Sequence, residues 1–267
     1  MMMVMNIIIK KSNKKGEIKM FQDRIDKLNE MIQKNNKIVF FGGAGVSTAS
    51  GIPDFRSENG LYNMDFEFYK GKDPEYLLSR ECLYNNPKLF YKFYRDFMDV
   101  RNFDPNIAHY KLAELEKAGK MLGVVTQNID GLHQKAGSEK VFQIHGTTQR
   151  VYCSKCGKEY PVDYIFTCPD EIPKCEKGCR GLIRPAVTLY SEQLPKDQMN
   201  DAIDAIYNAD MLIVAGTSLT VYPAASFVSY FGKGDMVLIN RTETPYDSYA
   251  NLVFREDISD VFEKIIV

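Results

Sequence analysis

Four of the six cysteines stand in two closely spaced pairs, Cys153/Cys156 and Cys175/Cys179. The first pair encloses two residues and the second encloses three, with 18 residues between the pairs. Two thiolates on one turn can hold the same metal ion, and a second such turn completes the tetrahedral sulfur shell that zinc prefers. Because four protein ligands leave no position for water, the spacing predicts a structural zinc ion. Two disulfides or inert thiols are the alternatives.

A run of small residues follows an apolar stretch. Lys37–Phe41 is predicted to be a buried strand, and the loop from Gly43 to Gly51 continues from it. Backbone N–H groups of such a loop can approach a pyrophosphate because no large side chain intervenes. Two features argue against a hydride-transferring dehydrogenase: Thr48 replaces the third glycine of the fingerprint, and no acidic residue closes a second strand about 20 residues later. Dinucleotide binding remains the favoured interpretation, and the loop runs on into Asp54-Phe55-Arg56.

Polar or glycine-rich residues also follow other short apolar segments. Further strands are predicted over 123–126, 141–144, 211–215, 236–239 and 252–254, with helical stretches between several of them. This pattern is typical of a parallel sheet covered by helices on both faces, which binds ligands at the carboxyl ends of its strands. The segments expected at those ends are Gly43–Ser47, Gln127–Asp130, His145–Gly146, Gly216–Ser218 and Asn240–Arg241.

The elements that carry these residues indicate an α/β fold with a Rossmann-like parallel sheet domain and a smaller lobe. The sheet domain is expected over residues 19–56, 106–145 and 185–267, with helices over 20–35 and from Ala108 to near Gly119. The smaller lobe combines a helical insertion over 57–105, which includes a helix over 87–97, with the zinc ribbon over 146–184. Residues 1–18 are expected to be a disordered or loosely docked leader, because their basic residues follow a short apolar run.

Composition is that of an ordinary globular chain. The 267 residues are 45% hydrophobic and 26% charged, with a net charge of −1. This charge gives no reason to expect a nucleic-acid or acidic-lipid partner. No stretch approaches the roughly 18 apolar residues of a membrane helix, so no membrane partner is expected. A cytoplasmic location is expected, with the nucleus left open.

Several motifs together resemble those of the sirtuins, the NAD-dependent protein deacylases of the silent-information-regulator type. The resemblance runs from about residue 20 to the C-terminus. It implies an enzyme that releases nicotinamide from NAD and transfers an acetyl group from lysine to ADP-ribose. The motifs that carry it are the loop over 43–56, Thr126-Gln-Asn-Ile-Asp130, His145-Gly146, the four-cysteine ribbon, Gly216-Thr-Ser218 and Leu238-Ile-Asn240.

The resemblance implies roles for individual residues. His145 would be the catalytic base toward the ribose hydroxyls, since neutral imidazole can accept a proton at cytosolic pH. Asn128 and Asp130 would hold the ribose and the nicotinamide carboxamide, and Arg56 would face the phosphates. The other cofactor contacts that the resemblance implies are Gly43, Ala44, Gly45, Thr48, Asp54, Phe55, Tyr62, Gln127, Ile129, Gly216, Thr217, Ser218, Asn240, Arg241, Asp257 and Ile258.

An acetyl-lysine protein or peptide is the implied substrate. It would lie between a strand over 187–192 and the loop over 221–224, held mainly by backbone hydrogen bonds, so sequence selectivity should be weak. Tyr190-Ser191-Glu192 departs from the Phe-Gly-Glu that is usual in the family. The substrate contacts expected are Val187, Leu189, Tyr190, Glu192, Val221 and Tyr222.

The preferred acyl group is predicted from one helix. Sirtuins that prefer succinyl or malonyl lysine carry Tyr-x-x-Arg, whereas Tyr91-Lys-Phe-Tyr94 places a neutral aromatic residue at the arginine position. Arg95 follows one residue later, about 100° around the helix, from where it could still swing toward an acyl carboxylate. Acetyl or longer neutral acyl groups are therefore expected over acidic ones.

Two other functions remain open on the sequence. Mono-ADP-ribosyl transfer would use the same cleavage of NAD with a protein nucleophile. A non-catalytic NAD-responsive module would use the ribbon for recognition, but such a sensor has no need of a base like His145. The other two histidines, His109 and His133, are expected to be structural.

Overall fold

A parallel sheet forms the centre of the larger domain. The computed structural model describes residues 2–57, 60–63, 69 and 72–267. Within them a six-stranded sheet has the order β3-β2-β1-β7-β8-β9, and all its neighbouring strands are parallel. Numbered along the chain, this is the 3-2-1-4-5-6 order of the Rossmann fold, so the predicted fold class is confirmed. The strands are β1 (Ile38–Gly42), β2 (Met121–Thr126), β3 (Val141–Gln143), β7 (Met211–Ala215), β8 (Asp235–Ile239) and β9 (Leu252–Phe254).

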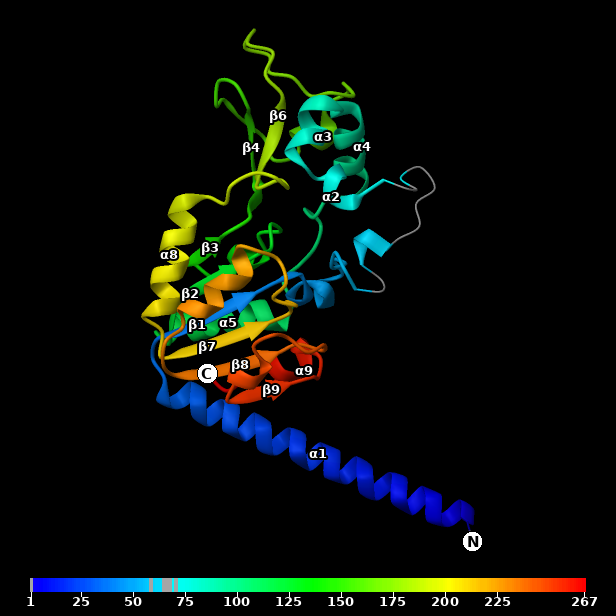
Figure 1. Ribbon diagram of the computed structural model, residues 1–267, viewed down its shortest axis with the longest axis vertical. Coiled ribbons are helices and arrows are strands. Elements are labelled where there is room, and N and C mark those ends of the chain that lie inside the picture. Colours follow the sequence, from blue (N-terminus) through cyan, green and yellow to red (C-terminus); the bar gives the residue numbers. More distant parts are fainter. Residues whose placement is uncertain (1, 58–59, 64–68, 70–71) are drawn as a thin grey trace.

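Alternate residues of the central strand β1 face two different helical layers. Ile38 and Phe40 belong to the core formed with α1, α5 and α9, whereas Val39 and Phe41 belong to the core formed with α8 and a 3₁₀-helix (Figure 1). Both faces of the sheet are buried, which explains why its strands are continuous apolar runs. These helices are α1 (Met2–Lys34), α5 (Ile107–Lys117), α8 (Lys196–Tyr207), α9 (Ile258–Phe262) and the 3₁₀-helix η5 (Ala224–Tyr230).

Helix α1 starts earlier than the predicted residue 20. Its buried residues Ile25, Leu28 and Ile32 follow the helical spacing of the sequence and pack on the sheet. The helix continues back to Met2, beyond the edge of the sheet (Figure 1). The predicted boundary between the leader and the sheet domain, at residue 19, therefore does not coincide with a break in secondary structure. A leader over 1–18 stays a prediction. No helix in the described part of the chain has the length and apolar character needed to cross a membrane.

The two predicted insertions share one core and form the smaller lobe, drawn above the sheet in Figure 1. Phe90 and Tyr91 of helix α4 pack with Val151 and Ile183 of the ribbon sheet β5-β4-β6. The Tyr91 hydroxyl also donates to the Ile183 carbonyl at 2.8 Å. The elements are α2 (Pro74–Leu77), α3 (Arg80–Asn85), α4 (Pro87–Phe97), β4 (Gly146–Cys153), β5 (Glu159–Tyr160), α7 (Tyr164–Thr167) and β6 (Ile183–Val187).

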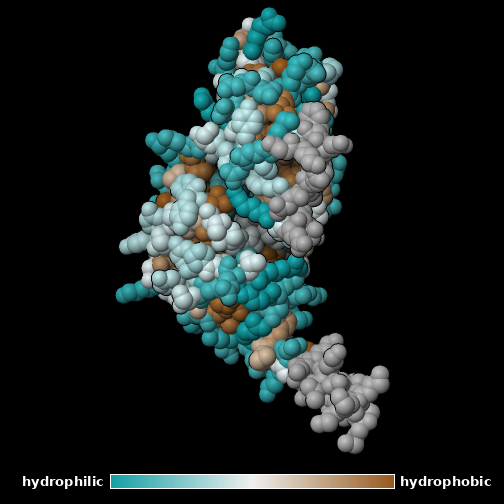
Figure 2. Space-filling model, turned by 45° about the vertical axis from the view of Figure 1, so that its right-hand side comes forward, coloured by the Kyte–Doolittle hydropathy of each residue, from teal (hydrophilic) through white to brown (hydrophobic). Residues whose placement is uncertain are grey.

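The domain limits given above remain a proposal, and strand β6 of the ribbon sheet (Ile183–Val187) crosses the limit between residues 184 and 185. Every strand of the large sheet falls within 19–56, 106–145 or 185–267. The helical insertion over 57–105 includes residues 58–59, 64–68 and 70–71, which lie outside the described part. Figure 2 shows a largely hydrophilic face on which hydrophobic patches occur both on the lobe and on the sheet domain.

Candidate active site

Two glycine-rich loops meet at the carboxyl ends of β1 and β7. The Gly45 N–H donates to the Gly216 carbonyl at 2.9 Å, and the Gly43 N–H donates to the Ala215 carbonyl at 3.2 Å. A Cβ on Gly43 or Gly45 would lie 2.8 Å from a backbone atom of Gly216. Both positions therefore need glycine for the loops to approach. The order of the sheet reverses at this edge, which is where nucleotides bind in such folds.

Asp130 is the centre of a buried polar network after β2. Ser47 Oγ donates to Asp130 Oδ2 at 2.7 Å, and Asn128 Nδ2 donates to Ser47 Oγ at 3.0 Å. The Leu132 N–H donates to Asp130 Oδ1 at 2.8 Å, where helix α6 (Leu132–Lys135) begins. Burial raises the pKa of Asp130, and these hydrogen bonds partly oppose that rise. The network joins the loops that follow β1 and β2.

Ser47 has a structural role that no motif in the sequence predicts. It is 1% exposed and bridges the side chains of Asn128 and Asp130. The only hint of a role in the sequence is its position in the glycine-rich motif. Thr48 and Ser50 carry hydroxyls nearby, so this hint does not single out Ser47. Its partner Asp130 lies 83 positions away, so the pairing cannot be seen in the local pattern.

His145 follows β3, and its Nδ1 lies 2.9 Å from the Gln127 carbonyl. A carbonyl oxygen can only accept, so Nδ1 carries the hydrogen and Nε2 of the neutral ring carries the lone pair. Burial lowers the pKa of His145, while the Gln127 carbonyl acts to raise it. The favoured form near pH 7 is therefore a neutral ring with a basic Nε2, as a general base requires.

Other predicted cofactor residues lie on the loops that leave the same edge. Gln127 Nε2 donates to Thr217 Oγ1 at 3.1 Å, which joins the loops after β2 and β7. The first loop continues through Asp54-Phe55-Arg56, and Arg56 pairs with Glu75 of the smaller lobe at 2.8 Å. These donors and acceptors fit a ligand that carries hydroxyl, amide and phosphate groups, as NAD does.

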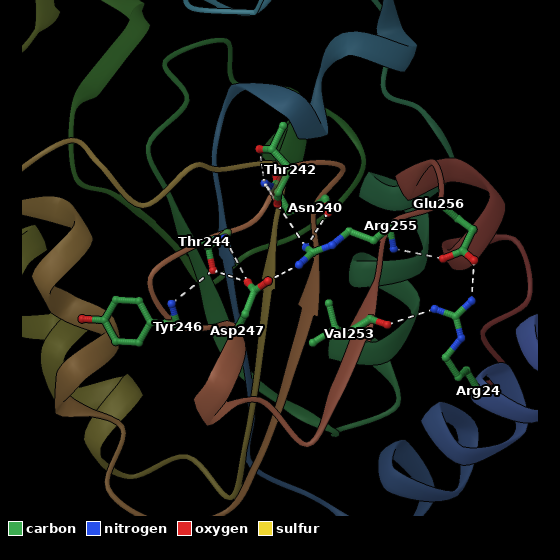
Figure 3. Close-up of polar contacts among 9 residues, drawn as sticks. All are labelled: Arg24, Asn240, Thr242, Thr244, Tyr246, Asp247, Val253, Arg255 and Glu256. Atoms are coloured by element: carbon green, nitrogen blue, oxygen red, sulfur yellow. Dashed lines mark hydrogen bonds and ion pairs between the residues drawn. The ribbon is translucent and has the colours of Figure 1, made fainter.

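The loop after β8 is organised by an arginine that no motif indicated (Figure 3). The Arg255 guanidinium donates to the Asn240 carbonyl at 2.9 Å and pairs with Asp247. Nearby, Arg241 pairs with Asp257 at 2.5 Å, and the Asp257 carboxylate caps helix α9. Three predicted cofactor contacts, Asn240, Arg241 and Asp257, therefore lie on adjoining segments. A lone arginine after a short strand has no recognisable spacing, so the role of Arg255 cannot be predicted from the sequence.

The four predicted zinc ligands converge in the ribbon. The sulfur atoms of Cys153, Cys156, Cys175 and Cys179 all lie within 4.8 Å of one another. The Cys153–Cys179 and Cys156–Cys175 sulfur distances are 3.5 and 3.7 Å. Tetrahedral zinc with bonds of about 2.3 Å separates its sulfurs by roughly 3.8 Å, so the site fits zinc. All four cysteines are unpaired, so the disulfide alternative is wrong.

The strand predicted over 187–192 is too long. Strand β6 ends at Val187, and beyond it Tyr190 forms a single β-bridge with Ser79 of the smaller lobe. Ser191 has a φ of 68°, in the left-handed region that interrupts a strand. The alternating apolar residues of this segment imitate a strand, but the chain turns at Ser191.

The predicted substrate residues, at this turn and in the loop over 221–224, have different environments. Arg184 donates to both carboxylate oxygens of Glu192, at 2.6 and 2.8 Å, and this pairing outweighs burial to hold the pKa of Glu192 below its usual range. Leu189 is buried, and its N–H donates to the same carboxylate at 3.0 Å. Tyr222, by contrast, is 72% exposed. Glu192 therefore maintains the shape of the turn.

His109 and His133 are buried side by side, with ring centroids 4.7 Å apart. His109 Nδ1 accepts from the Asn106 N–H at 3.2 Å, and the Asn106 side chain donates to the Val46 carbonyl at 2.8 Å. His109 thus supports the glycine-rich loop through Asn106. Burial lowers the pKa of His109 to about 4, and burial together with His109 lowers that of His133.

Acid is expected to destabilise the fold through this pair. Both histidines bind protons below about pH 6.5 in the unfolded chain but stay neutral in the folded one, so the free energy of unfolding falls as pH decreases from 6.5. A difference of one in pKa corresponds to about 1.4 kcal/mol, so His109 alone accounts for about 3 kcal/mol by pH 4. Denaturant titrations at pH 7.5, 5.5 and 4.5 measure this loss. His109→Gln should show a smaller slope against pH, whereas equal slopes in the two proteins would contradict the assignment.

Comparison with known proteins agrees with this geometry. The model of the Sir2 family matches residues 43–223. An NAD-dependent protein deacetylase of Clostridium acetobutylicum is 47% identical over 91% of this chain and 98% of its own length. A solved Sir2 structure with a deacetylated p53 peptide and 3′-O-acetyl ADP ribose is 35% identical, with a TM-score of 0.83 over 90% of this chain and 96% of its own. A Sir2–p53 peptide–NAD⁺ structure, also 35% identical, has a TM-score of 0.77 over 89% and 95%. By sequence and by fold, this chain belongs to the Sir2 family.

Proposed function

We propose that this chain is an NAD-dependent protein-lysine deacetylase that transfers acetyl groups to ADP-ribose and releases nicotinamide and free lysine. The observation that carries the proposal is the position of His145, whose basic Nε2 lies at the sheet edge that also holds the Asn128–Ser47–Asp130 network. The names of the relatives and the ligands of the solved Sir2 structures support the same reaction.

Each group at the sheet edge has a task in this reaction. NAD, when bound, supplies the ribose that receives the acetyl group and the nicotinamide that leaves. His145 Nε2 accepts a proton from a ribose hydroxyl, which makes that oxygen a better nucleophile. Asn128 and Asp130 offer the donors and acceptors that ribose hydroxyls and a carboxamide require. Ser47 holds these two side chains in one arrangement.

The direct test is to incubate the protein with an acetyl-lysine peptide, with and without NAD, and to follow peptide mass and nicotinamide. Loss of the acetyl group only with NAD, matched one-to-one by nicotinamide, supports the proposal. Nicotinamide release with mass gain on a protein target would indicate ADP-ribosyl transfer instead. Affinity for NAD without nicotinamide release would indicate a binding module.

Acetyl-lysine is expected to be processed at least about tenfold faster than succinyl-lysine. The Arg95 guanidinium donates to the backbone carbonyls of Ile165 at 2.7 Å, Cys168 at 3.2 Å and Asp170 at 2.8 Å. Turning it toward an acyl carboxylate would break these bonds to the ribbon and leave carbonyls unpaired. Initial rates on a peptide panel measure the preference. A butyryl-lysine peptide separates charge from length, and faster removal of succinyl groups would contradict the prediction.

We also propose a cytoplasmic location. All six cysteines are unpaired in the structure, and unpaired cysteines together with a thiolate metal site are typical of reducing compartments. Fractionation of cells that express the tagged full chain tests this location.

A further inference from the structure

Tyr190 links the segment proposed for peptide binding to the loop proposed for NAD binding. Its phenolic oxygen lies 2.9 Å from the Tyr62 hydroxyl and accepts from the Arg56 guanidinium at 3.2 Å. Arg56 and Tyr62 are predicted cofactor contacts that precede Tyr190 by 134 and 128 positions in the chain.

The backbone of Tyr190 is fixed independently of its side chain. The Tyr190 N–H donates to the Leu78 carbonyl, and the Arg80 N–H donates to the Tyr190 carbonyl, both at 3.1 Å. These bonds form the single bridge to Ser79. The smaller lobe thereby fixes the backbone that carries the phenol, and the phenol reaches Arg56 and Tyr62 from this anchored position.

The two partners of the hydroxyl are oriented by it in different ways. One terminal nitrogen of Arg56 donates both to Tyr190 and to Glu75, which defines the plane of the guanidinium. That guanidinium lies 5.6 Å from the centroid of the Tyr62 ring. Tyr62 is partly buried against Phe55, at a ring distance of 5.3 Å, so its hydroxyl has a satisfied partner in Tyr190. Without the Tyr190 hydroxyl, the partly buried Tyr62 hydroxyl would lose that partner.

We propose that the Tyr190 hydroxyl is a positioning group for NAD: it holds Arg56 toward the phosphates and keeps Tyr62 closed over the reacting pocket. This inference rests on the proposed function for the identity of the ligand. A bidentate donor such as Arg binds phosphate best when its plane is oriented beforehand, because less side-chain freedom is lost on binding. Removing the hydroxyl should weaken NAD binding and leave the chemical step largely unchanged.

The test compares wild type with Tyr190→Phe, which removes only the hydroxyl. The dissociation constant of NAD, measured by calorimetry without turnover, and the KM for NAD should both rise about fivefold. The value of kcat at saturating NAD and peptide should change less than twofold, which separates a binding effect from an effect on the chemical step. Tyr62→Phe should have a smaller effect, because the bond from Arg56 remains. The double variant should bind NAD no more weakly than Tyr190→Phe, because the two hydroxyls share one hydrogen bond.

Tyr91→Phe is the matched control, since it removes a buried hydroxyl whose partner is the Ile183 carbonyl within the smaller lobe. It should lower the melting temperature without changing NAD affinity. An NAD affinity of Tyr190→Phe within twofold of wild type, or tighter, overturns the proposal, as does an equal loss in Tyr91→Phe. A wild type that binds NAD but removes no acetyl group overturns the proposed function alone, because the calorimetric comparison still decides the role of Tyr190. A wild type without NAD affinity overturns both.

Discussion

Replacing His145 by Ala is expected to lower the rate of deacetylation by about 10²–10⁴-fold, the usual contribution of a positioned general base. The substitution removes Nε2, the basic nitrogen of the ring. In wild type the hydrogen bond from Nδ1 to the Gln127 carbonyl keeps the proton on Nδ1 and the lone pair on Nε2. Single-turnover rates with saturating NAD and acetyl peptide measure the loss. NAD affinity should change much less, because the Asn128–Ser47–Asp130 network remains.

His145→Gln distinguishes a base from a structural group. Its amide can still donate to the Gln127 carbonyl, but it has no basic nitrogen, so it should be as impaired as the Ala variant. Burial lowers the pKa of His145, so the base stays neutral to a lower pH than a free imidazole. The wild-type rate should therefore fall only below about pH 6.5. Activity in the Gln variant, or a fall that begins above this pH, would contradict the assignment.

Removing the zinc ion is expected to unfold the smaller lobe and abolish activity. A closed four-thiolate site contributes on the order of 10 kcal/mol, comparable with the roughly 5–15 kcal/mol by which whole domains are stable. Cys153 is buried in the same core as Phe90 and Tyr91, so loss of the ribbon also exposes helix α4. Cys175→Ser should lose the metal, show reduced helical circular dichroism and bind no peptide.

Cys168→Ser is the matched control for the metal site. Cys168 lies in the same lobe but is not one of the four cysteines whose sulfur atoms cluster at the metal site, which are Cys153, Cys156, Cys175 and Cys179. This variant should retain one zinc ion per chain by elemental analysis and keep its melting temperature within a few degrees. Loss of zinc in the Cys168 variant, or full activity in Cys175→Ser, would show that the ligand set is wrong.

The strands of the sheet could be predicted because each is recognisable from a few consecutive residues. The strands 211–215 and 252–254 have the predicted limits, and the other strands begin and end within two residues of theirs. Each is an apolar run bounded by polar or glycine residues, and burial on both faces demands such a run. The strand over 187–192 was predicted wrongly because Val187 and Leu189 alternate as in a strand. The left-handed backbone of Ser191 has no signature in residue type.

The sequence by itself determined the family, the zinc ligands and the segments at the sheet edge. These depend on residue types at short spacings, such as the two cysteine pairs and the closely spaced Gly43 and Gly45. Only the tertiary structure decided which partner each polar group has. Ser47 bridges to Asp130 across 83 positions, and Tyr190 reaches Tyr62 across 128. Buried donors and acceptors must be paired, and packing of elements far apart in the chain decides which groups are near enough to pair.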